Sequence, residues 1–229
     1  MSRSYEDGCA AAHALDLVGE RWALLVVREL LLGPKRFTDL RTGLPGISPN
    51  VLSQRLDELE RAGVVQRYRL LPPARSWVYE LTPWGRELEP IIIQLGRWGA
   101  RSPFRGPAAL SPDSLILSFR TMFDPQSCGD LRARYEFRLC DYRFHAEVAD
   151  GRLIIERGSA DRPDAIVSGG PDAIASLAYE GAGLAEAVAA GSVAVEGDLR
   201  AVERFFTLFS LPAPADAPEC EPAVGPRAQ

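Results

Sequence analysis

The segment 48–62, S-P-N-V-L-S-Q-R-L-D-E-L-E-R-A, gathers polar side chains whose chemistry suits base recognition. Asn, Gln and Arg side chains can form hydrogen bonds with base edges in the major groove of DNA, and Ser can do so more weakly. We predict DNA contacts from Ser48, Asn50, Ser53, Gln54 and Arg55. An ordinary surface helix is the alternative interpretation of this segment when it is taken alone.

The same segment carries the signals of a helix. Ser48 is a preferred N-cap residue, Pro49 suits the first helical position, and Gly63 suits the position just past the end. The spacing of Leu52, Leu56 and Leu59 predicts one buried face. This leaves the polar residues on the flanks or the open side, namely Asn50, Ser53, Gln54, Arg55 and Asp57. A helix of about 15 residues is about 22 Å long and fits the major groove.

Two runs with alternating residue character follow Gly63, namely V-V-Q-R-Y-R-L-L and S-W-V-Y-E-L-T, with Pro72-Pro73 between them. This pattern predicts an antiparallel hairpin. Its flanks and tip carry Arg67, Arg69 and Arg75, which we predict to contact DNA as well. A helix-turn-helix followed at once by a basic hairpin is the order of a winged helix, whose hairpin lies over neighbouring backbone or minor groove.

Three shorter helices are predicted before this unit, over residues 9–17, 22–32 and 37–41. The second is apolar on nearly every side apart from Arg28 and Glu29, which predicts that it is buried almost all round. Glycines and prolines at 19, 33–34 and 43–46 separate the three helices from each other and from the segment 48–62.

Thr82-Pro83 predicts the start of a further helix, over W-G-R-E-L-E-P-I-I-I-Q-L-G-R-W. Large apolar residues recur along it at a spacing near 3.5. We predict that this stripe is a dimerisation surface, because an apolar stripe needs a partner surface. Packing within the chain against a second domain is the alternative. The stripe consists of Trp84, Leu88, Ile91, Ile92, Leu95 and Trp98.

The net charge of −5 is unevenly divided along the 229 residues. Residues 1–104 hold 14 Arg and Lys against 12 Asp and Glu, whereas residues 105–229 hold 12 against 19. This asymmetry is the one expected if the first half meets an anion and the second does not. Because the excess in the first half is small, we expect DNA affinity to depend on where individual arginines are placed.

The length allows two domains, each able to bury a core. We also expect a cytoplasmic protein, for the following reason. No apolar run approaches the roughly 20 residues that span a bilayer, and the N-terminus lacks the apolar core of a signal peptide. The four cysteines are scattered without a C-x-x-C pair, which predicts neither a disulfide framework nor a zinc ribbon. They are Cys9, Cys128, Cys140 and Cys220.

These motifs together resemble the HxlR-type branch of the MarR-like winged-helix regulators, over residues 5–102. The resemblance rests on A-L-D-L-V-G-E-R-W-A-L-L-V-V-R-E-L-L-L-G-P-K-R-F-T-D-L, L-P-G-I-S-P-N-V-L-S-Q-R-L-D-E-L-E-R-A-G-V-V and Y-E-L-T-P-W-G-R-E-L, after a Cys near the start. It implies a homodimeric regulator that binds double-stranded DNA at a pseudo-palindromic operator. Many relatives end near residue 110 or 120, so the second half departs from the shortest pattern of the family.

The second half is predicted to be an α+β domain with a mostly antiparallel sheet. Strands are expected at 115–123, 134–139, 142–148, 152–156, 165–168 and 193–196, and helices at 171–179, 184–190 and 198–209. Asp150-Gly151 predicts a hairpin turn. The predicted organisation is a winged-helix domain over 1–102, a linker over 103–113, the α+β domain over 114–211 and a disordered tail over 212–229.

The runs D-A-I-V-S-G-G-P-D-A-I-A-S-L-A and A-G-S-V-A-V-E-G-D-L-R-A-V-E-R-F-F resemble sterol-carrier-type domains. This resemblance implies an apolar cavity that could hold a hydrophobic effector, and the alternative is that its aromatic residues are simply core. A ligand that favours one arrangement of the domains would change DNA affinity. The predicted lining residues are Phe119, Phe144, Phe205 and Phe206.

Cys9 is the predicted redox-sensor candidate, since some HxlR-type proteins sense oxidants or electrophiles through a Cys near the N-terminus. A helix start would lower its pKa, whereas Glu6 and Asp7 would oppose this, and an inert thiol is the alternative. Cys9 and His13 have the i, i+4 spacing of a ligand pair, but two residues are too few for a metal site and we predict none.

The chain lacks a nucleophile elbow, a phosphate loop, a paired-His motif and a dinucleotide fingerprint, so we predict neither an enzyme nor a bound cofactor. Three hypotheses remain open. The first is a homodimeric DNA-binding regulator modulated by a hydrophobic small molecule. The others are a thiol-sensing regulator acting through Cys9 and a lipid-binding carrier whose winged helix only dimerises.

Overall fold

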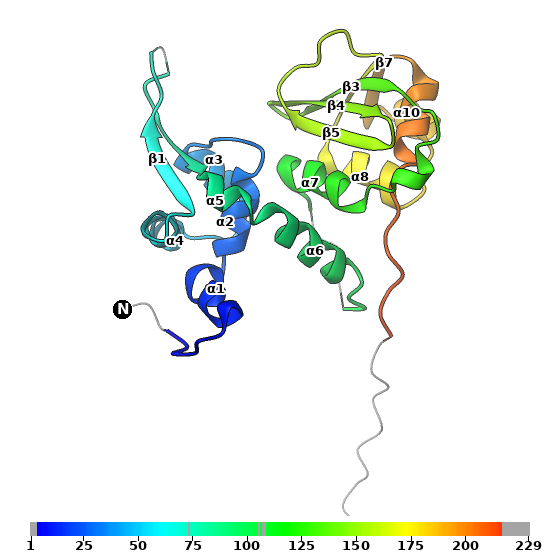
Figure 1. The fold of residues 1–229 in the computed structure, drawn as a ribbon. Coiled ribbons are helices and arrows are strands. Elements are labelled where there is room, and N and C mark those ends of the chain that lie inside the picture. The colour runs from blue at the N-terminus through cyan, green and yellow to red at the C-terminus, as the bar shows by residue number, and fades with distance from the viewer. Residues whose placement is uncertain (1–3, 73, 105, 107–108, 217–229) are drawn as a thin grey trace, which may run out of the picture.

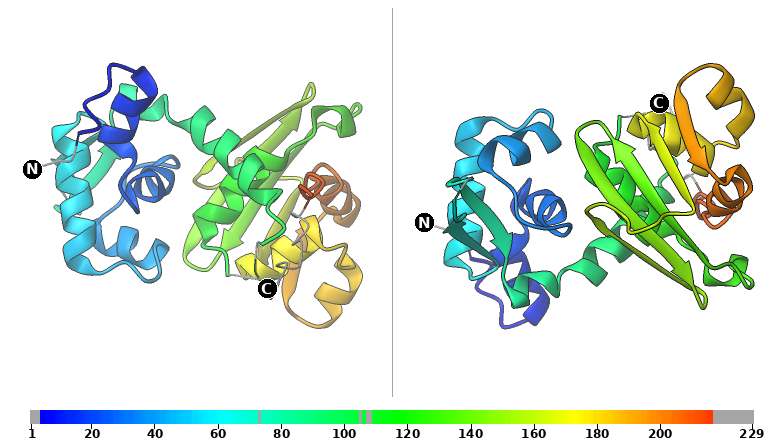
Figure 2. Two further views of the ribbon diagram at one scale, coloured as in Figure 1. Left: turned by 90° about the horizontal axis from the view of Figure 1, so that it is seen from below. Right: turned by 90° about the horizontal axis from the view of Figure 1, so that it is seen from above.

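A computed structural model of the protein describes residues 4–72, 74–104, 106 and 109–216. The elements form two groups, each around a hydrophobic core of its own, and helix α6 (Glu89–Ala100) runs from the first group to the second (Figures 1 and 2). None of the helices in the described part of the chain has the length and apolar character needed to cross a bilayer. Cys220 and most of the predicted tail, residues 217–229, lie outside the described residues.

The first group has the predicted order of helices followed by a hairpin. Strands β1 and β2 pair antiparallel, with Val65 opposite Leu81 and Arg69 opposite Trp77. The turn residue Pro73 lies outside the described residues. The elements are α1 Ala10–Val18, α2 Ala23–Leu30, α3 Phe37–Gly43, α4 Pro49–Arg61, β1 Val65–Arg69, β2 Trp77–Leu81, α5 Pro83–Arg86 and α6. The winged helix-turn-helix predicted from the sequence is confirmed.

Helix α4 begins and ends as its sequence predicts. The Ser48 Oγ accepts a hydrogen bond from the Val51 backbone N–H at 3.3 Å, and Pro49 occupies the first turn. Gly63 follows the helix with φ +73°, a conformation that glycine adopts without steric cost. The buried face consists of Leu52, Leu56 and Leu59, which share a core with Val26 and Val27 of α2.

The helix predicted after Thr82-Pro83 is divided into α5 and α6. The Thr82 hydroxyl caps α5 by accepting from the Gly85 N–H at 3.0 Å, as the sequence predicts. Pro90 then lies in the first turn of α6, where its missing N–H leaves no hydrogen bond unmade, so a new helix begins there. Leu88 and Ile92 pack against the first core, whereas the rest of the apolar stripe is exposed.

The second group is a five-stranded sheet in the order β5-β4-β3-β6-β7, antiparallel except for the β3–β6 pair. Helices α7 and α8 lie on one face of this sheet (Figures 1 and 2). The elements are α7 Pro112–Met122, a 3-10 turn Pro125–Ser127, β3 Ala133–Leu139, β4 Tyr142–Ala149, β5 Arg152–Arg157, β6 Ala165–Gly169, α8 Pro171–Tyr179, α9 Leu184–Ala189, β7 Val193–Gly197 and α10 Leu199–Phe206. The predicted α+β class is confirmed, as is the turn at Asp150-Gly151, where φ is +53° and +71°.

The strand predicted at residues 115–123 is wrong, because this segment is helix α7. The helix is buried on most sides, so its sequence has neither the alternation of a strand nor the one-sided stripe of a surface helix. Its start signals are Ser111, whose Oγ accepts from the Ser114 N–H at 3.1 Å, and Pro112 in the first turn. Both residues fall in the segment predicted to be a linker.

Candidate nucleic-acid interface

The open side of α4 presents three of the predicted base-reading residues. Asn50, Ser53 and Gln54 are all exposed. The Gln54 Nε2 donates to the Glu58 Oε1 at 3.0 Å, which holds the amide along the helix surface. Ser48 is exposed too, but its Oγ already accepts the cap bond, so its hydroxyl hydrogen is the part left for DNA. The helix therefore offers short donors and acceptors near its N-terminal end.

Arg55 does not share this face, and its predicted placement is corrected. It follows Leu52 by three residues and precedes Leu59 by four, so the helical period places it on the buried stripe. Its side chain is 8% exposed and pairs with the Glu58 Oε2 at 2.7 Å and the Glu20 Oε2 at 3.4 Å. Arg55 ties α4 to the segment before α2 rather than facing outward.

The hairpin carries Arg67, Arg69 and Arg75 on its surface, as predicted. In the described part of the chain, none of these three guanidinium groups forms an ion pair with a carboxylate. The Arg67 guanidinium lies 4.5 Å from the centre of the Trp77 ring, and the Arg69 Nε donates to the Arg75 carbonyl at 3.2 Å. These cations are held in place and their charges remain available to phosphates.

Lys35, in the turn between α2 and α3, anchors strand β2 of the hairpin at its middle residue. Its N–H donates to the Tyr79 carbonyl at 2.9 Å, and the Tyr79 N–H donates back to the Lys35 carbonyl at 2.8 Å. No sequence pattern predicts this bridge, because the two residues lie far apart in the chain. The hairpin is thereby fixed to the turn that leads into the helix-turn-helix.

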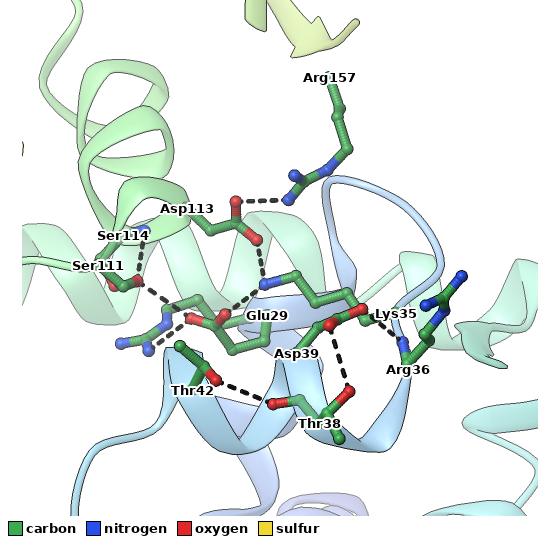
Figure 3. Close-up of polar contacts among 11 residues, drawn as sticks. Glu29, Lys35, Arg36, Thr38, Asp39, Thr42, Ser111, Asp113, Ser114 and Arg157 are labelled. Carbon is green, nitrogen blue, oxygen red and sulfur yellow. Dashed lines mark hydrogen bonds and ion pairs between the residues drawn. The ribbon is translucent and has the colours of Figure 1, made fainter. Parts of the chain in front are cut away.

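The Lys35 side chain belongs to a buried ionic cluster that joins the two groups of elements (Figure 3). Its Nζ pairs with the Glu29 Oε2 at 2.5 Å and also with the Asp113 carboxylate of α7. The Asp113 Oδ1 accepts from the Arg157 Nη2 of β5 at 2.5 Å. We call Glu29, Lys35, Asp113 and Arg157 the junction cluster. Through Lys35, it links α2 and strand β2 of the hairpin to the second group.

Neighbouring residues complete the surroundings of the Glu29 carboxylate. Its Oε1 accepts from the Arg28 Nη2 at 2.9 Å and from the Ser111 Oγ at 3.3 Å. Gly43 leaves room for it, since a Cβ on that residue would come 2.1 Å from the Glu29 Oε2. A buried charge is costly unless it is paired and hydrogen-bonded, and Glu29 meets both conditions. Arg28 and Glu29 are the exceptions in an otherwise apolar helix, but their partners cannot be predicted from the sequence.

Helix α6 joins the second group through polar contacts as well. Its Glu89 pairs with the Arg120 Nη1 of α7 at 2.5 Å, and the Arg120 Nη2 donates to the Ile155 carbonyl of β5 at 2.5 Å. Its Arg97 Nε donates to the Thr121 carbonyl at 2.5 Å. The second group is thus fixed to α6 and, through Lys35, to strand β2 of the hairpin.

The outward side of α5 and α6 exposes most of the predicted dimerisation stripe. Four of its residues are largely accessible in the single chain, namely Trp84 at 51%, Ile91 at 55%, Leu95 at 47% and Trp98 at 74%. An exposed apolar face of this kind is typical of a protein–protein interface. Leu88 and Ile92, by contrast, already pack within the chain.

Cys9 is exposed at the N-cap of α1. The backbone N–H groups of Ala12 and Ala11 at the start of α1 lower the pKa of its thiol. The Asp7 carboxylate accepts from the Cys9 backbone N–H at 2.9 Å. Around Cys9 and His13, as elsewhere in the described part of the chain, three or more His, Cys, Asp or Glu side chains do not gather into a possible metal site.

The four phenylalanines predicted to line an effector cavity lie in the packed second core. Phe119, Phe144 and Phe205 are fully buried, and the rings of Phe119 and Phe205 meet edge to face with centroids 5.6 Å apart. Phe206 is 7% exposed. A cavity of about 790 Å³ lies elsewhere, between α6, α7 and α8, and its described lining includes none of the four.

Comparison with known proteins gives two separate matches, one over each of the two groups of elements. Residues 17–104 match a family model described as HxlR-like helix-turn-helix, and residues 107–215 match one described as alkyl sulfatase C-terminal. The resemblance of the second half to sterol-carrier domains therefore stays a prediction. The HTH-type transcriptional regulator YdeP of Bacillus subtilis is 38% identical over 97 residues, which cover 42% of this chain and 74% of the relative.

Two solved structures show partial likeness. The reduced form of the transcriptional regulator YodB from B. subtilis is 31% identical with a TM-score of 0.39, covering 44% of this chain and all of that one. The sec-alkylsulfatase Pisa1 from Pseudomonas sp. is 20% identical with a TM-score of 0.43, covering 46% of this chain and 17% of that one. The identity with YdeP over most of its length, together with the winged-helix fold, shows that the chain belongs to the HxlR-like family of HTH-type transcriptional regulators.

Proposed function

We propose that the protein is a homodimeric, sequence-specific DNA-binding regulator rather than an enzyme, and that α4 and the hairpin form its DNA surface. The observation that carries the proposal is the exposed polar face of α4 followed directly by the hairpin arginines. Asn50 and Gln54 supply side-chain amides, which can bind the edge of adenine. Arg67, Arg69 and Arg75 supply charge for the backbone on either side.

The dimensions support insertion of α4 into the major groove. The 13 residues of the helix extend over about 20 Å, and the buried leucines hold its far side against α2. Ser48 precedes the two amides and Ser53 lies between them, so the contacts cluster in the N-terminal half of the helix. In helix-turn-helix proteins this end of the recognition helix contacts the base edges.

The exposed stripe of Trp84, Ile91, Leu95 and Trp98 supports pairing of two copies. A two-fold dimer places two recognition helices about one turn of DNA apart, so the proposed operator is pseudo-palindromic. Trp98→Glu should give a monomer in sedimentation equilibrium without loss of folding, because the side chain is exposed in the single chain. A dimer that persists in Trp98→Glu and in Ile91→Glu would contradict this assignment.

Base recognition is tested after the operator has been selected from random duplexes. Fluorescence anisotropy then compares operator with scrambled DNA for the unchanged protein and for Asn50→Ala/Gln54→Ala. Each lost bidentate contact should reduce the difference in binding free energy between operator and scrambled DNA by about 1–3 kcal/mol. Gln126→Ala, an exposed amide in the second group, is the matched control. An unchanged preference in the double variant would refute the recognition helix, and absence of DNA affinity together with a co-purifying lipid would favour a carrier.

We further propose that the second group modulates DNA affinity by binding a hydrophobic small molecule. Its attachment to α6 and, through Lys35, to strand β2 of the hairpin supports this, because a ligand that shifts the second group would act on both. Modulation through Cys9 is a second candidate, which its exposure and lowered pKa favour. DNA binding that diamide leaves unchanged would exclude the thiol candidate.

A further inference from the structure

We propose that the cavity between α6, α7 and α8 binds an amphipathic molecule with an apolar body and one anionic headgroup, and that Arg28 binds this headgroup. The inference rests on the proposed function, because it names the site and the chemical class of the effector. The site differs from the predicted one at the four phenylalanines, whose rings fill the core.

The cavity has the size and walls of a small-molecule site. Its volume of about 790 Å³ falls within the range of about 300–1,000 Å³ that such sites occupy. Hydroxyl groups in its walls already have partners, as in the pair of the Ser118 Oγ and the Tyr179 hydroxyl at 2.7 Å. Because these hydroxyl groups do not need a partner from the ligand, the wall can accommodate the apolar body of a ligand. The apolar lining includes Ile92, Ala100, Leu110, Leu117, Met122 and Ala175.

Arg28 is the one cationic side chain among the described lining residues. Its Nη2 donates to Glu29, whereas its Nε is buried and lacks a hydrogen-bond partner among the described residues. Because the Nε is buried, the donors open to a ligand are the N–H groups on the exposed part of the guanidinium, whose side chain is 23% exposed. A guanidinium has five N–H donors and binds a carboxylate through two of them at once, so these groups can bind a ligand anion.

Two carboxylates also border the cavity, at its exposed edge. The Asp172 Oδ1 accepts from the Leu110 N–H at 3.0 Å, and the Glu180 Oε2 accepts from the Ser176 Oγ at 2.8 Å. Because both side chains are exposed, water and salt screen their charges more strongly than that of the partly buried Arg28. We therefore assign the anionic end of the ligand to Arg28 and the apolar body to the space between the helices.

Arg28 also connects the cavity to the junction cluster. A headgroup on Arg28 competes with the Glu29 carboxylate, which in turn holds the Lys35 Nζ at 2.5 Å. The backbone of Lys35 pairs with Tyr79 of the hairpin. Occupation of the cavity therefore changes the charge balance around Lys35, next to strand β2 of the hairpin. By linkage, DNA must change the affinity for the ligand by the same factor as the ligand changes the affinity for DNA.

Dodecanoate is the probe for this site, with dodecanol and dodecyltrimethylammonium as probes of equal chain length. Isothermal titration of the full chain, below the micelle concentrations, should give one dodecanoate per chain. Dodecanol should bind at least about tenfold more weakly, because a hydrogen bond to a charged group is lost. Absence of saturable dodecanoate binding, or equal binding of dodecyltrimethylammonium, would overturn the proposal.

Two substitutions locate the binding site. Gly99→Leu should weaken dodecanoate binding at least tenfold, because Gly99 lines the cavity and a Cβ there meets no atom within 4 Å, so the added side chain fills space. Gly8→Leu, also at an open position but away from the cavity, is the control and should bind normally. Arg28→Met should weaken binding of dodecanoate about tenfold and leave dodecanol unchanged.

Unchanged dodecanoate binding by Gly99→Leu would refute this site, even if Arg28→Met failed to fold. The operator titration of each protein separates this inference from the proposed function. If dodecanoate binds but DNA does not, the proposed function is refuted and the ligand site stands. If DNA binds but dodecanoate does not, only the ligand site is refuted.

Discussion

The arginines of the hairpin and the cations of the junction cluster carry the same charge in opposite surroundings. Arg67, Arg69 and Arg75 are exposed and lack carboxylate partners among the described residues, whereas Lys35 is buried between two carboxylates. The difference shows that the small positive excess of the first half does not measure its DNA surface. Cations at the junction hold the molecule together, and those on the hairpin are available to an anion.

The largest effect should come from the junction cluster. Lys35→Met leaves the carboxylates of Glu29 and Asp113 buried without their shared cation, which should lower the free energy of unfolding by about 3–5 kcal/mol. Urea denaturation followed by circular dichroism measures this change. The exposed neighbour variant Arg36→Met should change stability by less than about 0.5 kcal/mol. Equal effects of the two would contradict the stabilising role assigned to the junction cluster.

Arg55 tests the comparison within a single helix. Arg55→Met removes pairs with Glu58 and Glu20, whose side chains are 30% and 60% exposed, so the loss of stability should be about 1–2 kcal/mol. The ratio of affinities for operator and scrambled DNA should stay the same, because the side chain lies on the buried stripe. If the ratio of affinities changed and the stability did not, Arg55 would instead be assigned to the DNA-contacting surface.

The hairpin arginines should show the reverse pattern. Arg67→Ala or Arg69→Ala should weaken binding to operator and scrambled duplexes alike, and should reduce the salt slope of the affinity by about 1 for each lost phosphate contact. Anisotropy titrations over a range of KCl concentrations measure both quantities. Arg200→Ala on α10 is the control of equal charge. A variant that alters only the operator affinity would show that the arginine reads bases.

The smallest predicted effect concerns Cys9. Because backbone N–H groups lower its pKa, its thiolate forms at a lower pH than that of a small thiol such as N-acetylcysteine amide. Alkylation by iodoacetamide, followed by peptide mass spectrometry from pH 6 to 10, should therefore have a lower midpoint. Burial raises the pKa of Cys128, which serves as the slow internal control. A midpoint at or above that of the small thiol would leave Cys9 as an inert thiol.

Local signals sufficed for much of the fold. The caps at Ser48 and Thr82, the glycine at 63 and the period-two runs of the hairpin each act within a few residues, so the sequence predicts them directly. Helix α7 was missed because burial on most sides removes the periodicity by which a helix is recognised.

The candidate site was predicted in part for a similar reason. Asn50 and Gln54 lie where the helical period places them, and the same period, counted from Leu52, would have assigned Arg55 to the buried face. The junction cluster could not be predicted, because Glu29, Asp113 and Arg157 meet only through the packing of separate elements. The cavity likewise depends on how α6 lies against α7 and α8.

The most direct test of the DNA surface is photo-crosslinking from single positions to a duplex that contains the selected operator. A photoreactive residue replaces Gln54 on α4, Arg69 on the hairpin or Glu203 on α10, all of which are exposed. The proposed surface predicts base crosslinks from position 54, backbone-proximal crosslinks from position 69 and none from position 203. Crosslinks from position 203 that equal or exceed those from position 54 would contradict the account.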